Sequence, residues 1–403
     1  MTTPSAKVST NLSDSLIGDW NYPNSIRAGA GRIKELTDAC QNLNIKAPLL
    51  VTDPGLAPLP MIKDAIKQCQ NVSLNCGLFS NLKSNPTGQN VADGVTAYKA
   101  GKHDGVIAFG GGSSLDIGKA IALMVGQSAD LWDFEDIGDN WTRVDASAIA
   151  PIIAVPTTAG TGSEVGRASV ITDEQQQLKR IIFHPQMLPS IVILDAELTT
   201  GLPPHITAAT GMDALSHNLE AFCAPSYHPM ADGIALEGIR LIKEHLPRAF
   251  ANGQDLDARS QMLVASTMGA TAFQKGLGGM HALAHTLGAL YDAHHGLLNA
   301  ILMPYVLNSN QSVIEARIQR LSRYLDLPDQ SFNGFMDWVL GLRAQLAIPH
   351  SLSKIGIDER QAKRVGEMAV QDAAAGGNPI LLSADQYSGI FLDAVRGKVT
   401  GQN

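Results

Sequence analysis

Histidines and one carboxylate gather in two stretches of the second half of the chain. Asp213 and His217 stand four residues apart, which puts both side chains on one face of a helix. Four of the chain's eleven histidines fall within 276–296: His281, His285, His294 and His295. Their background is apolar, so burying them together is costly unless they share a purpose. Imidazoles with a carboxylate suit Fe²⁺, Zn²⁺, Ni²⁺ or Mn²⁺, and the sequence predicts a site for one such cation.

Spacing alone leaves the ligand set open. His281 and His285 are also four residues apart and form a pair of the same kind. An isolated Asp/His pair at this spacing is commonly a surface or capping pair, and a lone histidine on an apolar face is commonly a core residue. The concentration of histidines in one stretch favours the metal site over these interpretations.

A glycine-rich turn in the first half is typical of a phosphate site. F-G-G-G-S-S-L-D (109–116) follows an apolar run and opens a helical stretch. Gly111 and Gly112 let the backbone approach a ligand, and the helix start offers free N–H groups and a positive dipole end. Ser113 adds a hydroxyl donor, and Asp116 lies in the first helical turn. The pattern is neither G-x-G-x-x-G nor a Walker A loop, so a plain tight turn is the alternative.

A second polar loop follows the next apolar run. The segment V-P-T-T-A-G-T-G-S-E-V (155–165) offers four hydroxyl groups, from Thr157, Thr158, Thr161 and Ser163. A helix cap with small neighbours is the other interpretation. Two such loops after neighbouring strands favour a ligand at the carboxyl edge of a parallel sheet.

Two further polar residues follow apolar strand-like runs. Asp53 ends the run PLLVTD, where a carboxylate accepts hydrogen bonds from an adenosine ribose and repels the 2′-phosphate of NADP. NAD is therefore the preferred cofactor. Asn85, in S-N-P-T, is a candidate for the same pocket. Both residues are also ordinary turn formers, which is the alternative for each.

The elements that must position these residues change character along the chain. From about 30 to 200, apolar runs alternate with helical stretches, which is typical of a parallel sheet buried on both faces. After G-L-P-P-H (201–205), helical spacing of apolar residues takes over. We expect a doubly wound, mostly parallel α/β domain over 1–203 and an all-helical domain over 204–403, divided at Pro203 and Pro204.

Composition excludes several classes of protein. The net charge is −8 and no run of Lys and Arg stands out, which argues against a nucleic-acid groove and against anionic membranes. No stretch is apolar for long enough to span a bilayer, and the first fifteen residues lack the apolar core of a signal peptide. We expect a cytoplasmic protein. The four cysteines contain no C-x-x-C pair and are expected to be free thiols.

Four segments together resemble the signature regions of the iron-containing alcohol dehydrogenases. They are GGGSSLD, VPTTAGTGSE, LPPHITAATGMDALSHNLEAF and GLGGMHALAHTLGALYDAHHG, and the likeness extends over about residues 20–390. The resemblance implies the architecture shared with dehydroquinate synthase, an α/β dinucleotide domain before a helical metal domain. It also implies NAD-linked hydride transfer between a small alcohol and its aldehyde, in a homodimer, with Fe²⁺ as the first candidate metal.

The resemblance also implies a role for individual residues. The metal ligands are Asp213, His217, His281 and His295. His285 lies near the nicotinamide, and His294 is a neighbour only. The cofactor contacts are Asp53, Asn85, Gly111, Gly112, Ser113, Asp116, Thr157, Thr158, Thr161, Lys179 and Thr199. Lys179 reaches the nicotinamide ribose, with a solvated surface lysine as the alternative.

One departure from the family pattern lies just before G-L-G. The chain has F-Q-K at 273–275, where the family has small or amide residues. By similarity this turn lies beside the substrate, which makes Phe273 and Lys275 candidate substrate contacts. We hypothesise that Lys275 meets an anionic group of the substrate, and the alternative is that it points into a domain or subunit contact.

Two other functions fit the same architecture. One is a lyase or cyclase of the dehydroquinate synthase type, in which NAD is reduced only transiently. The other is a non-catalytic nucleotide-binding protein. The D-A-L-S-H and H-A-L-A-H stretches favour the dehydrogenase.

Overall fold

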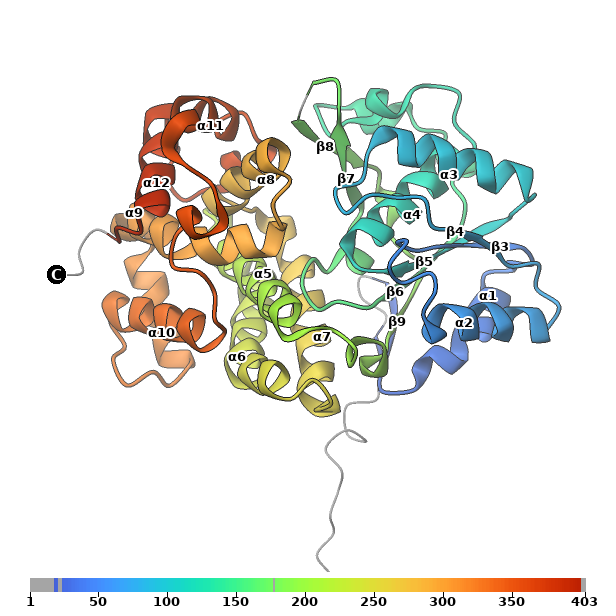
Figure 1. Ribbon diagram of the computed structural model, residues 1–403, viewed down its shortest axis with the longest axis horizontal. Helices are drawn as coiled ribbons and strands as arrows, with labels where there is room; N and C mark the ends of the chain where they lie inside the picture. The colour runs from blue at the N-terminus through green and yellow to red at the C-terminus, as the bar shows by residue number, and fades with distance from the viewer. Residues whose placement is uncertain (1–17, 21–23, 177, 400–403) are drawn as a thin grey trace, which may run out of the picture.

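The computed structural model describes residues 18–20, 24–176 and 178–399, and the polar first fifteen residues lie outside this part. The chain forms two halves that lie side by side, one built on a sheet and one made of helices (Figure 1). None of the helices described is long and apolar enough to cross a membrane.

A seven-stranded sheet is the centre of the first half. Its order is β1-β2-β9-β6-β5-β3-β4, with every neighbouring pair parallel except β1 with β2. The bounds are β1 Gly18–Trp20, β2 Ser25–Ala28, β3 Pro48–Val51, β4 Gly77–Phe79, β5 Gly105–Gly110, β6 Ile152–Pro156 and β9 Ile191–Leu194. This confirms the predicted mostly parallel sheet.

Helices cover both faces of this sheet. On one face, α1 (Leu36–Asn42) and α2 (Pro60–Asn71) bury their apolar sides, and on the other α3 (Gly88–Ala100) and α4 (Gly112–Met124) do so. Because both faces are covered, every residue of β3, β5, β6 and β9 is buried, which explains why these strands are continuous apolar runs in the sequence. The sheet half is therefore doubly wound, as predicted.

A two-stranded hairpin stands apart from the main sheet. It consists of β7 (Ala168–Asp173) and β8 (Leu178–Phe183), which are antiparallel. The hairpin packs on α4, and β8 also contacts α8 of the helical half. The sequence analysis did not predict it, and it brings Lys179 to the boundary between the halves.

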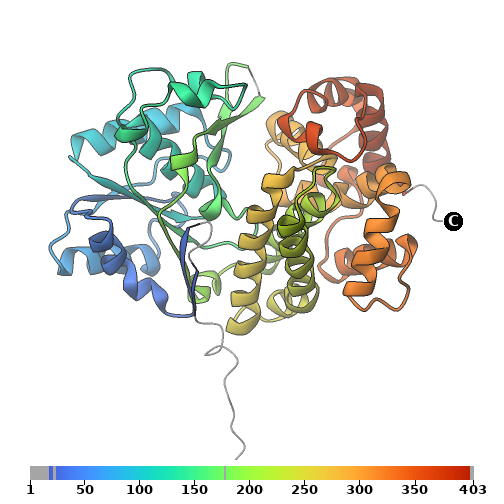
Figure 2. The same ribbon diagram turned by 180° about the vertical axis from the view of Figure 1, so that it is seen from behind.

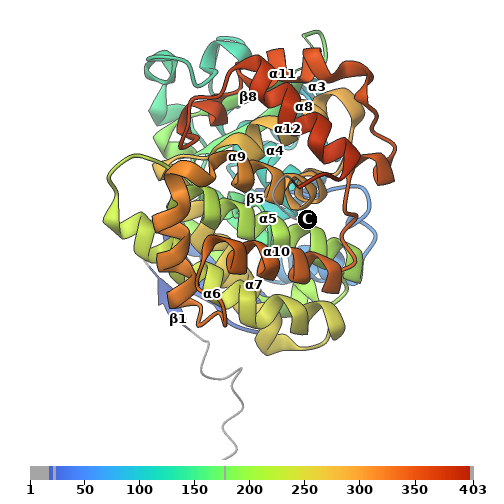
Figure 3. The ribbon, with the colours of Figure 1, turned by 90° about the vertical axis from the view of Figure 1, so that its left-hand side faces the viewer.

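The second half is a helical bundle, as predicted. Its helices are α5 Pro204–Cys223, α6 Pro229–Ala251, α7 Leu256–Ala272, α8 Gly279–Tyr291, α9 His295–Tyr324, α10 Phe332–Gln345, α11 Ala362–Ala369 and α12 Ala384–Arg396. Helix α5 is the central one, because α6, α7 and α9 all pack on it (Figure 3). It starts with Pro204 at its first position, where a proline costs no hydrogen bond.

Helix α5 is buried almost from end to end, so any polar side chain on it is taken out of water. Helix α7 lies next to the sheet half and contacts β9 (Figure 2). Polar groups on the side of α5 near α7 and α8 are therefore within reach of the loops that follow the strands. This arrangement brings the two histidine stretches and the glycine-rich turn to the same boundary.

Candidate metal and cofactor site

Four side chains converge at the start of α8 and α9. Asp213 and His217 come from α5, His281 from α8 and His295 from the first position of α9. Each offers one ligand atom, and these four atoms all lie within 4.8 Å of one another. The ring centroids of His217 and His281 are 4.6 Å apart, and those of His281 and His295 are 5.4 Å apart. Helical spacing on α5 thus places two ligands side by side, and tertiary packing adds the other two.

The chemistry of this set fits a divalent cation. Burial holds the pKa of His281 and of His295 well below the usual range, so both rings present neutral lone pairs. The side-chain amide of Asn299 lies where the lone pairs of His281 and His295 meet the carboxylate of Asp213. That N–H₂ group donates 2.8 Å to Asp213 Oδ1 and lies 3.2 Å from the Nε2 atoms of His281 and His295. Three imidazoles and one carboxylate suit Fe²⁺, Zn²⁺, Ni²⁺ or Mn²⁺.

Hydrogen bonds on the far side of two rings orient them. His217 Nδ1–H donates 3.1 Å to the carbonyl of Gly160, in the polar loop after β6. His281 Nδ1–H donates 2.6 Å to Glu220 Oε2. Each bond leaves Nε2 as the free lone pair aimed at the cluster, which is how metal-binding histidines are usually held. The bond to Gly160 also joins the cluster to the sheet half.

Glu220 is a functional candidate that the sequence analysis missed. Besides His281, its carboxylate accepts the backbone N–H groups of Gly278 (2.8 Å) and Met280 (2.7 Å), which fixes the start of α8. Burial raises the pKa of Glu220 to about 7, and the bonds from Met280 and Gly278 oppose that rise. The signal in the sequence was a glutamate three residues after His217 on an otherwise apolar helix.

We expect Glu220→Gln to weaken metal binding while the fold persists. The amide keeps an acceptor oxygen but removes the charge that makes His281 a stronger donor, and losing such a partner typically costs about 10–100-fold in metal affinity. Titration of the metal-free protein with Zn²⁺ against a competing chelator measures this. Glu237→Gln is the matched control, because Glu237 pairs with Arg240 on the outer side of α6. Equal affinities of the two variants would contradict the role of Glu220.

His285 stands next to the cluster but is not one of the four converging residues. Its Nδ1–H donates 3.0 Å to Asp372 Oδ2, and its ring stacks on that of His295 with centroids 5.3 Å apart. His294 points elsewhere, because its Nδ1 accepts the N–H of Leu297 and caps α9. The structure thus separates His285 and His294 from the converging group, a distinction that spacing did not provide.

The two polar loops of the sheet half lie against each other. Gly110 has a φ of +147°, and α4 begins at Gly112, with Gly111 as its N-cap. A methyl group added at Gly111 would lie 3.5 Å from the side chain of Thr158, and one added at Gly112 would lie 2.6 Å from that of Thr161. A side chain at Gly112 would therefore clash with Thr161, so the two loops can approach this closely only with a glycine there. Their meeting point, at the start of a helix and at the carboxyl edge of the sheet, fits a pyrophosphate site.

Several predicted cofactor residues border the same loops. Thr157 donates its N–H to the carbonyl of Gly110 (3.0 Å), which joins the two loops. Ser113 donates its hydroxyl to the carbonyl of Ser84. Asp53 follows β3 and accepts the N–H groups of Gly55 (2.9 Å) and Leu56 (3.0 Å), as a turn former does. These bonds fix the shape of the carboxyl edge where the glycine-rich turn lies.

Two of the expected cofactor residues have hydrogen-bond partners inside the protein. Both carboxylate oxygens of Asp116 are used inside the protein, by Ser163 Oγ and by the N–H of Val170 (3.0 Å), so this residue holds the loop and hairpin in place. Thr199 is buried and donates its hydroxyl to the carbonyl of Ala196 (2.8 Å) in its own turn. The structure thus gives both side chains hydrogen-bond partners inside the protein.

Lys179 is not a solvated surface lysine. Its Nζ donates 2.9 Å to Asn85 Oδ1, and the amide of Asn85 donates to Asp292, which ends α8 in a left-handed conformation. Burial lowers the pKa of Lys179, while the carboxylates of Asp116 and Asp292 oppose that shift. The chain Lys179–Asn85–Asp292 therefore bridges the hairpin, the loop before α3 and the helical half.

The structure overturns the expected substrate contact of Lys275. Its ammonium is buried, forms an ion pair with Asp232 (2.5 Å) and donates to the carbonyl of Phe222 (3.2 Å). Arg317 pairs with the same aspartate (3.2 Å). Lys275 thus joins α5 and α6 inside the helical half, which is neither the substrate contact nor the domain or subunit contact that the sequence analysis considered. Phe273, by contrast, lies beside the cluster, with its ring centroid 5.2 Å from that of His217.

We expect Lys275→Ala to lower stability without changing substrate preference. Removing one partner of a buried ion pair costs about 3–5 kcal/mol, and the remaining Arg317 places the loss at the lower end of that range. Chemical denaturation of wild type and variant measures the free energy of unfolding. The ratio of kcat/KM for an anionic and a neutral aldehyde should stay the same, and a fall confined to the anionic aldehyde would restore the substrate contact.

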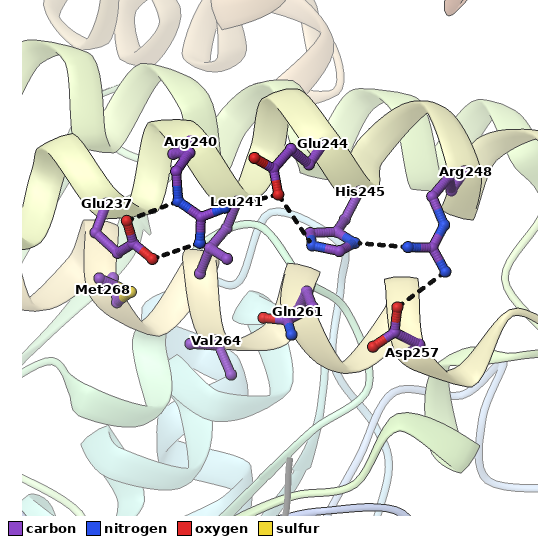
Figure 4. A pocket seen from close by; sticks show the side chains of 10 residues that line it. All are labelled: Glu237, Arg240, Leu241, Glu244, His245, Arg248, Asp257, Gln261, Val264 and Met268. Atoms are coloured by element: carbon purple, nitrogen blue, oxygen red, sulfur yellow. Dashed lines mark hydrogen bonds and ion pairs between the residues drawn. The ribbon is translucent and has the colours of Figure 1, made fainter. Parts of the chain in front are cut away.

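A groove of about 620 Å³ also lies between α6 and α7, on the outside of the helical half (Figure 4). Its guanidinium groups are already paired, Arg240 with Glu237 and Glu244, and Arg248 with Asp255 and Asp257. The residues that converge on the metal position do not line it. We assign it no part in the chemistry.

Comparison with known proteins gives matches over nearly the whole chain. The family model described as iron-containing alcohol dehydrogenase matches residues 23–196, and its C-terminal counterpart matches 207–395. The 4-hydroxybutyrate dehydrogenase of Cupriavidus necator is 40% identical, over 91% of this chain and 97% of that protein. A crystal structure of 1,3-propanediol oxidoreductase has a TM-score of 0.86 at 34% identity, covering 91% of this chain and 96% of that one.

A third comparison bears on the cofactor. The crystal structure of sulfoacetaldehyde reductase from Bifidobacterium kashiwanohense in complex with NAD⁺ has a TM-score of 0.83 at 26% identity, covering 96% of this chain and 99% of that one. Both solved structures share both halves of the fold with this chain.

Proposed function

Because the chain belongs to the iron-containing alcohol dehydrogenase family, we propose that one divalent cation is held by four of its side chains: Asp213, His217, His281 and His295. Fe²⁺ is the first candidate, and Zn²⁺, Ni²⁺ and Mn²⁺ suit the same donors. Membership confirms the expected reaction class, NAD-linked hydride transfer between an alcohol and its carbonyl product, over the lyase and the non-catalytic alternatives. The convergence of the four ligand atoms within 4.8 Å carries the proposal.

The cofactor is NAD, held at the carboxyl edge of the sheet. The turn Gly111–Gly112 and the start of α4 take the pyrophosphate, with hydroxyl groups from the loop after β6 at its side: Thr157, Thr158 and Thr161. Asp53 borders the adenosine end, and Ser113, in the first turn of α4, borders the phosphates. Asn85 and Lys179 border the nicotinamide end, where β8 meets α8.

The residues around the four proposed ligands hold them in position to bind a cation and an oxyanion. When bound, the cation lowers the pKa of an alcohol and polarises a carbonyl, and NAD accepts or returns the hydride. Glu220 and the carbonyl of Gly160 fix the rings of His281 and His217. His285, oriented by Asp372, is placed beside the cluster to carry the alcohol proton away through its ring nitrogen. Phe273 shields the side of His217 from water.

The substrate that this proposal favours first is a small primary alcohol carrying a carboxylate. The relative with 40% identity is a 4-hydroxybutyrate dehydrogenase, and Lys179 offers an ammonium beside α8, where its Nζ lies 3.3 Å from the position that a Cβ at Gly288 would take. A neutral diol is the second candidate. It is favoured because the ammonium of Lys275 is occupied by Asp232 and because a 1,3-propanediol oxidoreductase has the same fold.

A panel of alcohols distinguishes these substrates. The protein is loaded with Fe²⁺ without oxygen, and NADH formation is followed with 4-hydroxybutyrate, 1,3-propanediol and 1-butanol. A kcat/KM at least about tenfold higher for 4-hydroxybutyrate supports the carboxylate-bearing class, and the reverse order supports the diol. No NADH with any alcohol, and no NADH oxidation with the aldehydes, would contradict the proposed activity.

The assembly and compartment complete the proposal. A homodimer is supported by a charged fraction of only 17%, below the ~25% of an average protein, which suits chains that bury faces against each other. A cytoplasmic location is supported by the four free cysteines, which suit a reducing compartment. Light scattering after size exclusion gives the mass, and a monomer at micromolar concentration would contradict the dimer.

A further inference from the structure

The start of α8 has no side-chain cap of its own. Its N-cap is Gly278 and its first residue is Gly279, and neither has a side chain that could accept the N–H groups left free at a helix start. His281 lies in the first turn of this helix, so any movement of the start also moves this proposed ligand. What holds the start of α8 therefore matters for the metal site.

Two side chains from elsewhere in the chain bond three consecutive N–H groups there. The carboxylate of Glu220 accepts the first and the third, and Asn378 Oδ1 accepts the middle one, from Gly279 (3.0 Å). A methyl group added at Gly278 would lie 3.0 Å from an oxygen of each acceptor, so both are packed tightly against the backbone. The start of α8 is thus held from two sides, by α5 and by the segment that carries Asn378.

Asn378 is itself fixed by a second amide. The side chains of Asn310 and Asn378 bond to each other reciprocally, with each nitrogen 2.9 Å from the other oxygen. The nitrogen of Asn378 also donates to the carbonyl of Ile380 (2.7 Å). Both asparagines are buried. Asn310 belongs to α9, which begins at the proposed ligand His295, so the pair joins the start of α8 to a second ligand-bearing helix.

The turn that precedes Asn378 also orients His285. It is the 3₁₀ segment Ala373–Gly377, with Asp372 directly before it and Asn378 directly after it. Asp372 accepts the ring N–H of His285. A methyl group added at the last residue of the turn would lie 2.1 Å from the carbonyl of Leu277, so the turn lies directly against the segment before α8. One turn thus holds α8 at its start and again at His285.

We propose that Asn378 is a positioning residue for the metal ligand His281, held in that role by Asn310. The inference rests on the proposed metal site. Asn378 acts through the backbone, because it sets where α8 begins and hence where Nε2 of His281 lies. Without it, the N–H of Gly279 and the amide of Asn310 would be left buried and unpaired, which favours a shift of the helix start until both find partners.

Three measurements separate positioning from plain stability. Competition with a chelator gives the affinity of the metal-free protein for Zn²⁺, at a temperature at which every variant is folded. The visible spectrum of the Co²⁺-loaded protein reports the arrangement of its ligands. Hydrogen exchange with mass spectrometry, on the metal-free protein, reports whether the start of α8 is released. A purely structural role would lower the thermal midpoint but leave the affinity and the spectrum as in wild type.

Asn378→Ala is expected to weaken Zn²⁺ binding about tenfold, at the lower end of the range for partners of metal ligands, because Glu220 still holds His281. The Co²⁺ spectrum should change, and exchange at the start of α8 should become faster. Asn310→Ala keeps the acceptor for Gly279 and removes only the amide that holds Asn378. It should show the same changes with a smaller loss of affinity, and it serves as the test if Asn378→Ala does not fold.

Tyr305→Phe is the matched control. Tyr305 is a buried residue of α9 and donates its hydroxyl to the carbonyl of His350 (2.8 Å), in the segment after α10. The variant therefore also loses a buried hydrogen bond on the helix of Asn310, but not one that leads to α8. We expect a lower thermal midpoint with Zn²⁺ affinity, Co²⁺ spectrum and exchange at the start of α8 all as in wild type.

The outcomes distinguish this inference from the proposed metal site. If wild type binds Zn²⁺ and both asparagine variants bind it as tightly as Tyr305→Phe does, the positioning role is overturned and the metal site stands. If wild type binds no Zn²⁺, the metal site fails and the positioning role fails with it. Unchanged exchange at the start of α8 in Asn378→Ala would overturn the hold on the helix whatever the metal result.

Discussion

His281→Ala is expected to remove bound metal and activity together. His281 lies in the middle of the converging group, stacked on His217 and held by Glu220, and its Nε2 faces Asn299 beside Asp213. Loss of the cation removes several kcal/mol of transition-state stabilisation, which corresponds to about a thousand-fold or more in kcat/KM. Metal analysis of the purified variant and NADH formation with the best alcohol of the panel measure the two effects.

His294→Ala is the matched control for this experiment. His294 directly precedes a proposed ligand in the sequence but caps α9 through Leu297 and points away from the group. Losing a cap costs about 1 kcal/mol of stability and leaves the four ligand atoms in place. We expect this variant to bind metal as wild type does. A His281→Ala enzyme with full activity and no metal would refute the mechanism.

Gly111→Val is expected to prevent tight binding of NAD. The added side chain enters the space between the start of α4 and Thr158, where the pyrophosphate is proposed to lie. Gly111 has an ordinary extended backbone, so valine is tolerated by the fold. A loss of about 3 kcal/mol in cofactor binding raises KM for NAD by about 100-fold. Steady-state kinetics at saturating alcohol give this value.

The control variant replaces Gly201, a glycine that also has room for a side chain. A side chain added at Gly201 meets nothing within 4 Å, and this position lies in the turn between the sheet half and α5. Gly201→Val should leave KM for NAD unchanged. The metal content of both variants should equal that of wild type, since neither residue is near the cluster. An unchanged KM in Gly111→Val would exclude this turn as the phosphate site.

The parts of the fold that follow from local pattern were predictable. Strands β3, β5, β6 and β9 are buried on both sides, so their sequences are continuous apolar runs. The hairpin β7–β8 was missed because it is only half buried and carries polar residues on one side. Helix α9 continues through the polar stretch N-S-N-Q at 308–311, where Asn310 lies buried and bonds to Asn378.

The candidate site was predictable where residue type is unusual for its surroundings. Histidines in an apolar stretch indicated a shared role, and the family resemblance named the four that the structure brings together. Their partners were not predictable. Asp372 is 87 residues from His285, and the Glu220 carboxylate meets His281 across 61 residues. Only tertiary packing makes such contacts, so no local spacing signals them.

The prediction for Lys275 failed because a distant residue pairs with it. Its position shortly before a proposed metal ligand predicted a contact with the substrate. Its ammonium instead points to Asp232 and the carbonyl of Phe222. Its true partner Asp232 is 43 residues away at the start of α6. A charged residue close in sequence to a metal ligand therefore predicts a contact with the substrate only if no residue from elsewhere in the chain forms an ion pair with it.

The central claim is that one cation joins the helical half to the reacting alcohol. The most direct test is an anomalous difference map from crystals of the metal-loaded protein, collected at the absorption edge of the bound metal. The account predicts a single strong peak about 2.0–2.2 Å from an oxygen of Asp213 and from one nitrogen each of His217, His281 and His295. A stoichiometric metal found elsewhere, or held without these four side chains, would contradict it.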